Sequence, residues 1–325
     1  MSDRRGRRFL GIGRRLAAVV LALFGTAVAA ALLLDYRLNP VAVGQDSYVF
    51  VGEREDFSLR NGGNIVNTAF VVTADGVVVI DTGSTRRYGE AMRAAIARIT
   101  DQPIREVWIT HHHPDHFLGN QAYADRPIAA LAGSSHGMRD EGQSFAANVY
   151  RMTGDWAKGT EPLAPGVVLT AGVRDIGGHR FRLIALGGHT AADLAVFDET
   201  TGILYAGDLV FHDRAPTTPH ADIPRWLNSL DQLAAVPFRT LVPGHGLPAA
   251  DDAPIRQTRA WLTWLVGMLQ DSASRGLDPA EILERPLPKE FAAIPLAREE
   301  LARSIAHLYR GMELPTIGAT GTDRH

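Results

Sequence analysis

The feature that most constrains this chain is a cluster of metal-ligand side chains at residues 110–116, which reads THHHPDH and contains H-x-H-x-D-H. Imidazole nitrogens and carboxylate oxygens are ligands of borderline divalent ions such as Zn²⁺. His111 and His113 are two residues apart, so they point to the same side of an extended segment. Pro114 disfavours helical geometry at His113 and allows a helix to begin beyond it, over 117–124. The motif therefore predicts two metal ions side by side, because the acid and the histidine after the proline can bind a second ion next to the first.

Further acids and histidines follow expected strands along the chain. Residues 104–110 alternate apolar and polar side chains, which predicts a strand directly before the motif. Apolar strands expected at 181–186, 203–205 and 240–242 each lead to a glycine and a potential ligand. These three ligands are His189, Asp208 and His245. A fourth residue, Asp81, is the acid that ends a buried strand at 77–80. Because α/β folds place their sites at strand ends, the set favours a built metal site over a histidine-rich surface loop.

Taken in order, these motifs resemble the five signature motifs of the metallo-β-lactamase-fold hydrolase superfamily, over roughly residues 64–247. The resemblance implies an α/β fold in which two mixed β-sheets pack between helices, an αββα sandwich. It implies that one zinc ion is held by His111, His113 and His189 and the other by Asp115, His116 and His245. It further implies that Asp208 bridges the two ions, and that Asp81 orients ligands without binding metal.

A narrower resemblance is carried by Gly63–Asn67, by Ile80–Gly83 and by His113–Asn120. These segments are similar to the exported branch called quinoprotein relay system zinc metallohydrolases, which is related to hydrolase-like proteins of sulfur-oxidation clusters. This branch implies a small-molecule substrate handled beside periplasmic dehydrogenases. Periplasmic redox proteins are therefore expected as partners.

The expected chemistry is hydrolysis of a small ester, thioester or related acyl or sulfur compound by a metal-bridging hydroxide. Zinc lowers the pKa of bound water from 15.7 to about 7, which supplies a nucleophile at neutral pH. Asp115 is the expected catalytic proton acceptor. His212 and His220, in the loop after Asp208, are candidates for substrate contact. His112 is expected to point away from the ligands, and His307 to lie at the surface.

Four other functions remain open at this stage. A glyoxalase-type thioesterase shares the full ligand set. A β-lactamase shares the fold, but lactamases generally lack the bridging acid that Asp208 supplies, and one major class uses a cysteine that this chain lacks. A persulfide dioxygenase would use a single Fe²⁺ held by His111, His189 and Asp208. The last alternative is a non-catalytic metal-binding accessory protein of a periplasmic redox system.

Composition narrows these choices. The chain has no cysteine, so thiolate zinc sites and disulfides are excluded, and histidine and carboxylate must hold any metal. Six of the 33 basic residues and one of the 36 acidic residues lie within residues 1–15; the remainder has 27 basic and 35 acidic residues, a net charge of −8. Nucleic acid is therefore not an expected partner, because phosphate backbones require clustered lysine and arginine.

The N-terminus predicts export. Its arginine cluster precedes an uncharged run at 16–34, so residues 1–34 are expected to be a signal peptide or N-terminal membrane anchor that engages the membrane or the export machinery. The protein is then periplasmic or anchored to the outer face of the cytoplasmic membrane. Residues 35–250 are expected to form the catalytic domain, with a partly helical insertion at 134–165 above the site. Residues 251–325 are expected to be a helical extension packed on the same domain.

Overall fold

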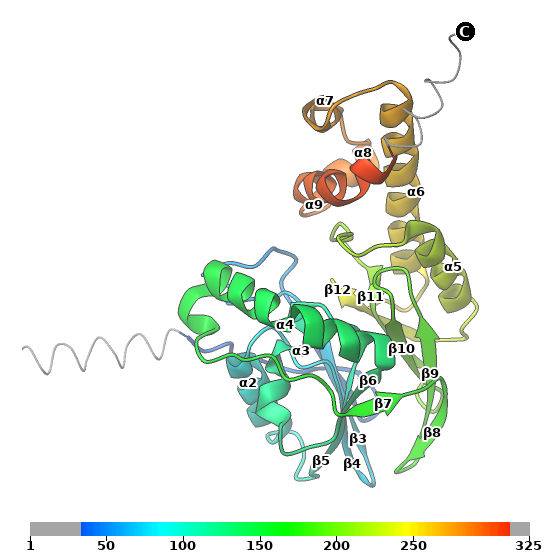
Figure 1. Ribbon diagram of the computed structural model, residues 1–325. Coiled ribbons are helices and arrows are strands. Elements are labelled where there is room, and N and C mark those ends of the chain that lie inside the picture. The colour runs from blue at the N-terminus through cyan, green and yellow to red at the C-terminus, as the bar shows by residue number, and fades with distance from the viewer. Residues whose placement is uncertain (1–33, 313–325) are drawn as a thin grey trace, which may run out of the picture. The chain divides into compact units, whose positions relative to one another are not determined.

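The computed structural model describes residues 34–312, in which two β-sheets pack face to face and helices cover their outer faces (Figure 1). This confirms the αββα sandwich that the family resemblance implies. The residues from Leu38 onward form one compact unit, to which the description below applies. The expected signal peptide or anchor, apart from residue 34, and the last thirteen residues lie outside the described part. Within 34–312, no helix has both the length and the apolar composition that crossing a bilayer requires.

The first sheet has seven strands that lie in sequence order. They are β1 (Val41–Gly44), β2 (Ser47–Phe50), β3 (Thr68–Thr73), β4 (Gly76–Ile80), β5 (Ile104–Ile109), β6 (Ile128–Leu131) and β7 (Val167–Leu169). The strands from β4 to β7 are parallel. Every residue of β4 is buried, as is typical of a parallel strand covered on both faces. The helical segments between these strands are α2 (Arg86–Ile96), α3 (Pro114–Phe117), η1 (Leu118–Tyr123), α4 (Ala132–Thr153) and η2 (Gly154–Trp156).

The second sheet has five strands in the order β12-β11-β10-β9-β8. They are β8 (Gly172–Ile176), β9 (His179–Leu186), β10 (Asp193–Asp198), β11 (Ile203–Phe211) and β12 (Thr240–His245), and only β11 and β12 are parallel. Between the sheets, Trp108 of β5 meets Phe181 of β9 edge to face, with ring centroids 5.2 Å apart. Burial of such large aromatic side chains supplies much of the apolar free energy that holds the sheets together.

The C-terminal helices share a hydrophobic core with the second sheet. They are α6 (Ala253–Ser274), α7 (Pro279–Glu284), α8 (Lys289–Ala292), α9 (Ala297–Ser304) and the π-helical turn η3 (Ile305–Tyr309). Leu265 of α6 and Leu301 of α9 are buried in the same cluster as Leu209 of β11. The same cluster includes Trp226 of α5 (Ile223–Ala234), a helix that begins at the side-chain cap of Asp222. These helices therefore extend the fold that carries the strand-end residues.

Two local expectations differ from the structure in detail. The segment expected to be helical over 117–124 is helical, but its α-helical turn ends at Phe117 and the rest is the 3₁₀-helix η1. The strand expected at 203–205 continues to Phe211, so Asp208 lies inside a strand and not after one. The second difference matters for the site, because it places a carboxylate within a fully buried strand.

Candidate metal centre

The loop from β5 to α3 separates the four ligands of the central motif into two pairs. His111 and His113 extend from the end of the strand, whereas Asp115 and His116 come from the first turn of α3. His113 has extended backbone angles (φ −72°, ψ 148°) directly before Pro114, as expected for a residue that precedes proline. All four side chains are buried. The local sequence therefore directs two pairs of ligands into one interior space.

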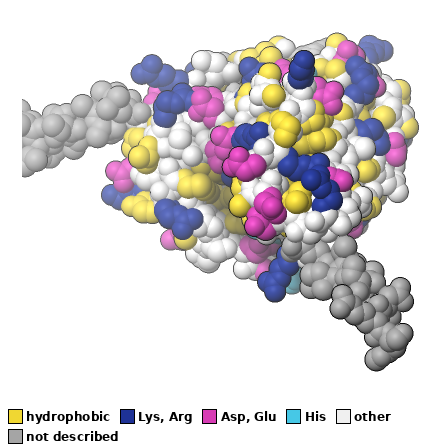
Figure 2. Space-filling view, turned by 90° about the horizontal axis from the view of Figure 1, so that it is seen from above, with side chains coloured by type: hydrophobic (Ala, Val, Ile, Leu, Met, Phe, Trp, Pro, Cys, Tyr) yellow, Lys and Arg dark blue, Asp and Glu magenta, His cyan; other side chains and the backbone are white. Residues whose placement is uncertain are grey.

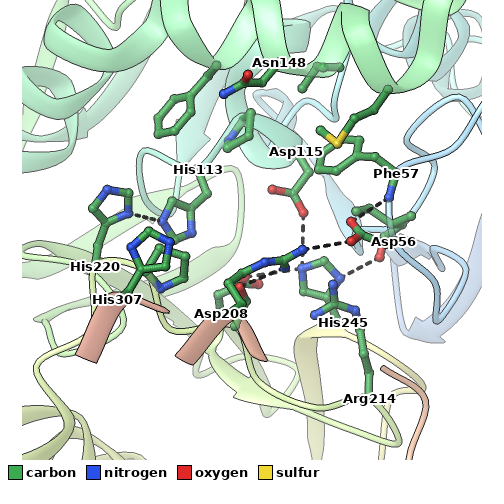
Figure 3. Close-up of a pocket in the computed structure, with 18 of the residues that line it drawn as sticks. Asp56, Phe57, His113, Asp115, Asn148, Asp208, Arg214, His220, His245 and His307 are labelled. Atoms are coloured by element: carbon green, nitrogen blue, oxygen red, sulfur yellow. Dashed lines mark hydrogen bonds and ion pairs between the residues drawn. The ribbon is translucent and has the colours of Figure 1, made fainter. Parts of the chain in front are cut away.

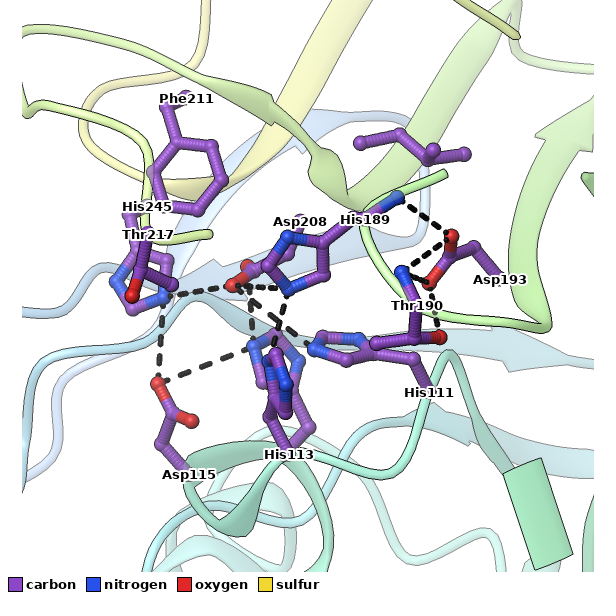
Figure 4. A network of polar contacts seen from close by, with 12 residues as sticks. His111, His113, Asp115, His189, Thr190, Asp193, Asp208, Phe211, Thr217 and His245 are labelled. Atoms are coloured by element: carbon purple, nitrogen blue, oxygen red, sulfur yellow. Dashed lines mark hydrogen bonds and ion pairs between the residues drawn. The ribbon is translucent and has the colours of Figure 1, made fainter. Parts of the chain in front are cut away.

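Seven residues form two groups whose ligand atoms lie within 4.8 Å of one another in each group (Figure 4). One group is His111, His113, His189 and Asp208; the other is Asp115, His116 and His245. Asp208 lies between the groups. Its Oδ1 is 3.1 Å from Nε2 of His116, and its Oδ2 is 3.4 Å from Nε2 of His189 and 3.3 Å from Nε2 of His245. This geometry suits a carboxylate shared by two cations.

Glycines bring Asp208 into this position. The pairing of β11 with β12 shifts register at Gly207, which has a φ of +54° that glycine adopts without steric cost. On the neighbouring strand, a Cβ at Gly244 would overlap the Asp208 carboxylate. The glycine before His245 is therefore required by the close approach of the two strands.

The outward nitrogens of three histidines are held by hydrogen bonds. Nδ1 of His116 lies 2.7 Å from Oδ2 of Asp81, and Nδ1 of His245 donates to the carbonyl oxygen of Ile65 at 2.6 Å. Nδ1 of His111 is 3.0 Å from Oγ1 of Thr110. These contacts orient each ring so that its Nε2 faces Asp208 in the interior.

Asp81 is the centre of these outer contacts. It accepts the Thr110 backbone N–H at 2.8 Å and the Thr110 hydroxyl at 2.8 Å, in addition to the His116 ring. Its positive φ of 59° is uncommon for a residue other than glycine and marks a constrained turn. Asp81 therefore fixes the orientation of a ligand without facing the interior space.

Sequence reasoning missed several residues that support the ligands. Thr110 contacts both Asp81 and His111, and Asp193 accepts the backbone N–H of His189 at 3.1 Å. Asn67 donates to the carbonyl oxygens of Pro243 and Gly246 on either side of the last ligand histidine. Thr110 and Asp193 lie close to ligands in the sequence, so a search for short polar neighbours would have found them. Asn67 carries no such signal.

The donor set fits divalent cations. Among the described residues, Nε2 of His111, Nε2 of His116 and Oδ1 of Asp208 are buried and make no well-aligned hydrogen bond, although the last two atoms lie 3.1 Å apart as an ion pair. Unsatisfied buried polar atoms are costly, so several at one point indicate a missing partner. Nitrogen and carboxylate ligands without sulfur match the chemistry of zinc and also that of iron.

The imidazoles of the first group are neutral. Burial lowers the pKa of His111 and of His113 well below the usual value, and the histidines around them lower both further. Burial also lowers the pKa of His189 to about 3, although Asp208 opposes this shift. Neutral rings offer the lone pairs that metal binding requires.

The second group is charged, and so is Asp208 of the first group. Burial would raise the pKa of Asp115 and of Asp208, but the adjacent His116 and His245 outweigh this effect and lower both. Burial would lower the pKa of His116, but Asp208, Asp81 and Asp115 raise it well above its usual value. The negative charge of the carboxylates is thus compensated by protonated histidines. A bound metal cation can supply this positive charge in place of the protons.

A cavity of about 450 Å³ opens above the two groups (Figure 3). Helix α4 contributes Phe145, Asn148 and Met152 to its wall, so the insertion expected at 134–165 is a long helix that lines the cavity. His220 lines the cavity, whereas His212 lies outside its lining, with Nδ1 2.7 Å from the carbonyl oxygen of Leu247.

The C-terminal helices also form part of the cavity wall. His307, expected at the surface, is exposed but lines the cavity together with Arg303. Arg303 donates to Glu300 at 2.7 Å and to Asp56 at 2.8 Å. Buried Arg214, from the segment after β11, lies 3.6 Å from Glu300. This charged cluster could not be predicted from the sequence, because Asp56 and Arg214 are far from Glu300 and Arg303 in the chain.

The model of the metallo-beta-lactamase superfamily matches residues 61–245, which is more than half of the chain. The chain therefore belongs to this superfamily. Solved structures similar to it include a metallo-beta-lactamase from Pontibacter korlensis, with a TM-score of 0.57 and 22% identity, covering 70% of this chain and 99% of that chain. A metallo-beta-lactamase from Hirschia baltica has a TM-score of 0.56 and 18% identity, covering 69% and 97%. At these identities the likeness shows the fold.

Among curated proteins, a linear primary-alkylsulfatase of Pseudomonas sp. (strain ATCC 19151) is 24% identical, over 73% of this chain and 54% of its own length. A hydroxyacylglutathione hydrolase of Rhodobacter capsulatus is 28% identical, over 54% of this chain and 60% of its own length. The chain thus spans between half and two thirds of the length of these two relatives. Both relatives are hydrolases.

We predict that Asp81→Asn weakens divalent-metal binding by about 10–100-fold while the fold is retained. An amide in place of the carboxylate removes one acceptor, so one of the three donors around Asp81 loses its partner, while asparagine tolerates the positive φ. Competition with a chelator measures the affinity, and Asp101→Asn at an exposed position is the matched control. Equal affinities of the two variants would contradict the orienting role of Asp81.

Proposed function

We propose that this protein is an exported hydrolase that binds two zinc ions and cleaves a small ester, thioester or sulfur-containing ester. The observation that carries the proposal is the convergence of seven buried ligand residues into two groups that share Asp208, beneath a cavity open to substrate. His111, His113 and His189 would hold one ion, Asp115, His116 and His245 the other, and Asp208 both. Seven ligands are too many for one tetrahedral zinc site.

When bound, zinc ions lower the pKa of a coordinated water and polarise the bond to be cleaved. Asp115 lines the cavity, and its Oδ2 lies 3.2 Å from Nε2 of His245. Its low pKa keeps the carboxylate ionised at neutral pH. It is therefore the residue best placed to accept a proton from water at the cavity floor. The buried position of the ligands limits access of bulk water to this point.

The substrate class is proposed from the cavity wall and the relatives. Phe57, Phe145 and Met152 offer apolar contacts, whereas Arg214 and Arg303, which are paired with Glu300 and Asp56, offer guanidinium donors. A substrate with an apolar portion and a polar or anionic ester group fits this combination. The names of the two relatives, an alkylsulfatase and a hydroxyacylglutathione hydrolase, support sulfate esters and thioesters as the first compounds to test. A small metabolite handled beside periplasmic quinoprotein or sulfur-oxidising enzymes is consistent with this class.

No nucleic acid is proposed as a partner. On the face shown in Figure 2, basic and acidic side chains are interspersed with apolar ones and do not form a surface of one sign. Proteins that bind phosphate backbones present clustered basic residues. Together with the net charge of −8 beyond residue 15, this favours a small molecule as the substrate.

The purified protein is expected to contain two zinc ions per chain and to hydrolyse at least one compound in a panel of alkyl sulfates, carboxylic esters and thioesters. Metal analysis gives the stoichiometry, and chelation followed by zinc addition should abolish and restore turnover. A β-lactam in the panel distinguishes the lactamase alternative. One iron per chain, with oxygen uptake on glutathione persulfide and no hydrolysis, would refute the proposal in favour of a persulfide dioxygenase.

Asp208→Ala is expected to abolish turnover and to release at least one metal ion, because the shared carboxylate offsets repulsion between two cations. The fold should remain, since the cores on either side of the site consist of apolar side chains. Metal content and circular dichroism measure the two effects. Asp175→Ala, on the exposed edge strand β8, is the control and should retain both ions. Full metal content in Asp208→Ala would contradict the bridging role.

We further propose that the residues beyond the N-terminal segment lie in the periplasm, either free or anchored at the outer face of the cytoplasmic membrane. The arginine cluster before the uncharged run at 16–34 motivates this location. A C-terminal alkaline phosphatase fusion is expected to be active, and a variant with the six arginines of residues 1–15 changed to glutamate should lose that activity. A fusion reporter that functions only in the cytoplasm would refute the location.

A further inference from the structure

A chain of hydrogen bonds joins the metal loop to helix α4. Nε2 of His113 lies 2.8 Å from Nδ1 of His220, as the dashed line in Figure 3 shows. Nε2 of His220 lies 3.1 Å from Oε2 of Glu141 on α4. The other oxygen of Glu141 is 3.3 Å from Nε2 of His112. His112, which is buried, therefore contacts the same carboxylate, and one of its ring nitrogens lies within 4.8 Å of those of His113 and His220.

The carboxylate at the end of the chain sets the direction of every bond in it. An ionised carboxylate only accepts hydrogen bonds, so His220 must carry its proton on Nε2 to donate to Glu141. Nδ1 of a neutral His220 is then an acceptor, and His113 must carry its own proton on Nε2. The lone pair of His113 is thereby left on Nδ1. This nitrogen faces the first ligand group, 2.8 Å from Nε2 of His189.

We infer that Glu141 and His220 are positioning residues that fix the tautomer and the ring orientation of His113, so that its Nδ1 is offered to a metal ion. His220 contacts the ring of His113 directly, whereas Glu141 contacts it only through His220. Glu141 acts across two hydrogen bonds and His220 across one. The inference rests on the proposed metal centre, but it does not depend on which substrate the enzyme cleaves.

Helix α4 carries both Glu141, which helps to position His113, and part of the cavity wall. Glu141, Phe145, Asn148 and Met152 are spaced by four, three and four residues, so they lie along one face of the helix. The last three line the cavity, and the ring of Phe145 packs edge-on against His113 and His220. One helix face thus contributes both to the cavity and to the orientation of a ligand, which ties the roof of the cavity to the metal loop.

The expected loss of metal affinity depends on how exposed Glu141 and His220 are to water. Removal of a partner that orients a metal ligand costs about 10–100-fold in metal affinity. The side chains of Glu141 and His220 are 38% and 33% exposed, so water can replace part of the lost interaction. We therefore expect an effect near the lower end of this range, about tenfold.

The test compares Glu141→Gln with Asp140→Asn. Both changes remove one carboxylate from adjacent positions of α4, but Asp140 is exposed and pairs only with His136 among the contacts described. Zinc affinity, measured by competition with a chelator, should fall about tenfold in Glu141→Gln and stay unchanged in Asp140→Asn. Equal affinities in the two variants would overturn the inference. A raised KM with unchanged zinc affinity would also overturn it, because it would indicate substrate contact.

A second pair of variants separates positioning from a structural effect. The amide of His220→Gln can accept from His113 and donate to Glu141, whereas His220→Ala can do neither. We expect the glutamine variant to retain more zinc affinity than the alanine variant. Equal losses in both would overturn the role of His220.

Nitrogen-15 spectra of the imidazoles in metal-free protein give a readout that needs no metal. His113 should be the Nε2–H tautomer in the parent protein and a mixture in Glu141→Gln. An unchanged tautomer would overturn the inference. A parent protein that shows the expected tautomers but binds no metal would refute the proposed function and leave the hydrogen-bond chain intact.

Discussion

The structure depends on placing the Asp208 carboxylate inside a buried strand, between two groups of imidazoles. An ionised carboxylate in the protein interior is costly unless positive charge compensates it. His116 and His245 provide that compensation within 3.3 Å, and two cations would provide it more fully. The bulge at Gly207, the bare backbone at Gly244 and the parallel pairing of β11 with β12 all serve to bring the compensating groups to one point.

The placement of the four candidate ligands at 111–116 was predictable from the sequence because it is decided locally. Two residues of extended chain put His111 and His113 on one side, and Pro114 starts the turn that separates them from Asp115. The structure brings all seven expected ligands together. It places Asp81 against His116, where the family resemblance implied an orienting residue.

Residues whose positions depend on tertiary packing could not be predicted. Glu141 lies in a helix of 22 residues with no motif, and only the packing of α4 over the metal loop brings it to His220. Among the histidines considered for substrate contact, the sequence could not distinguish His212 from His220, because both lie in one irregular segment. The extent of β11 was underestimated for a related reason, since a bulge interrupts the apolar pattern that strand prediction uses.

The cluster around Glu300 indicates why the C-terminal helices belong to the cavity. Glu300 is fully buried, and burial raises its pKa, although Arg214 and Arg303 oppose this shift. Arg214 comes from the segment after β11 and Arg303 from α9. Arg303 also donates a hydrogen bond to Asp56, in the segment before β3. Removing one of the two arginines would be costly, because it would leave the buried carboxylate with less compensating charge. Three distant segments are therefore joined at the cavity wall, to which α9 and η3 contribute Arg303 and His307.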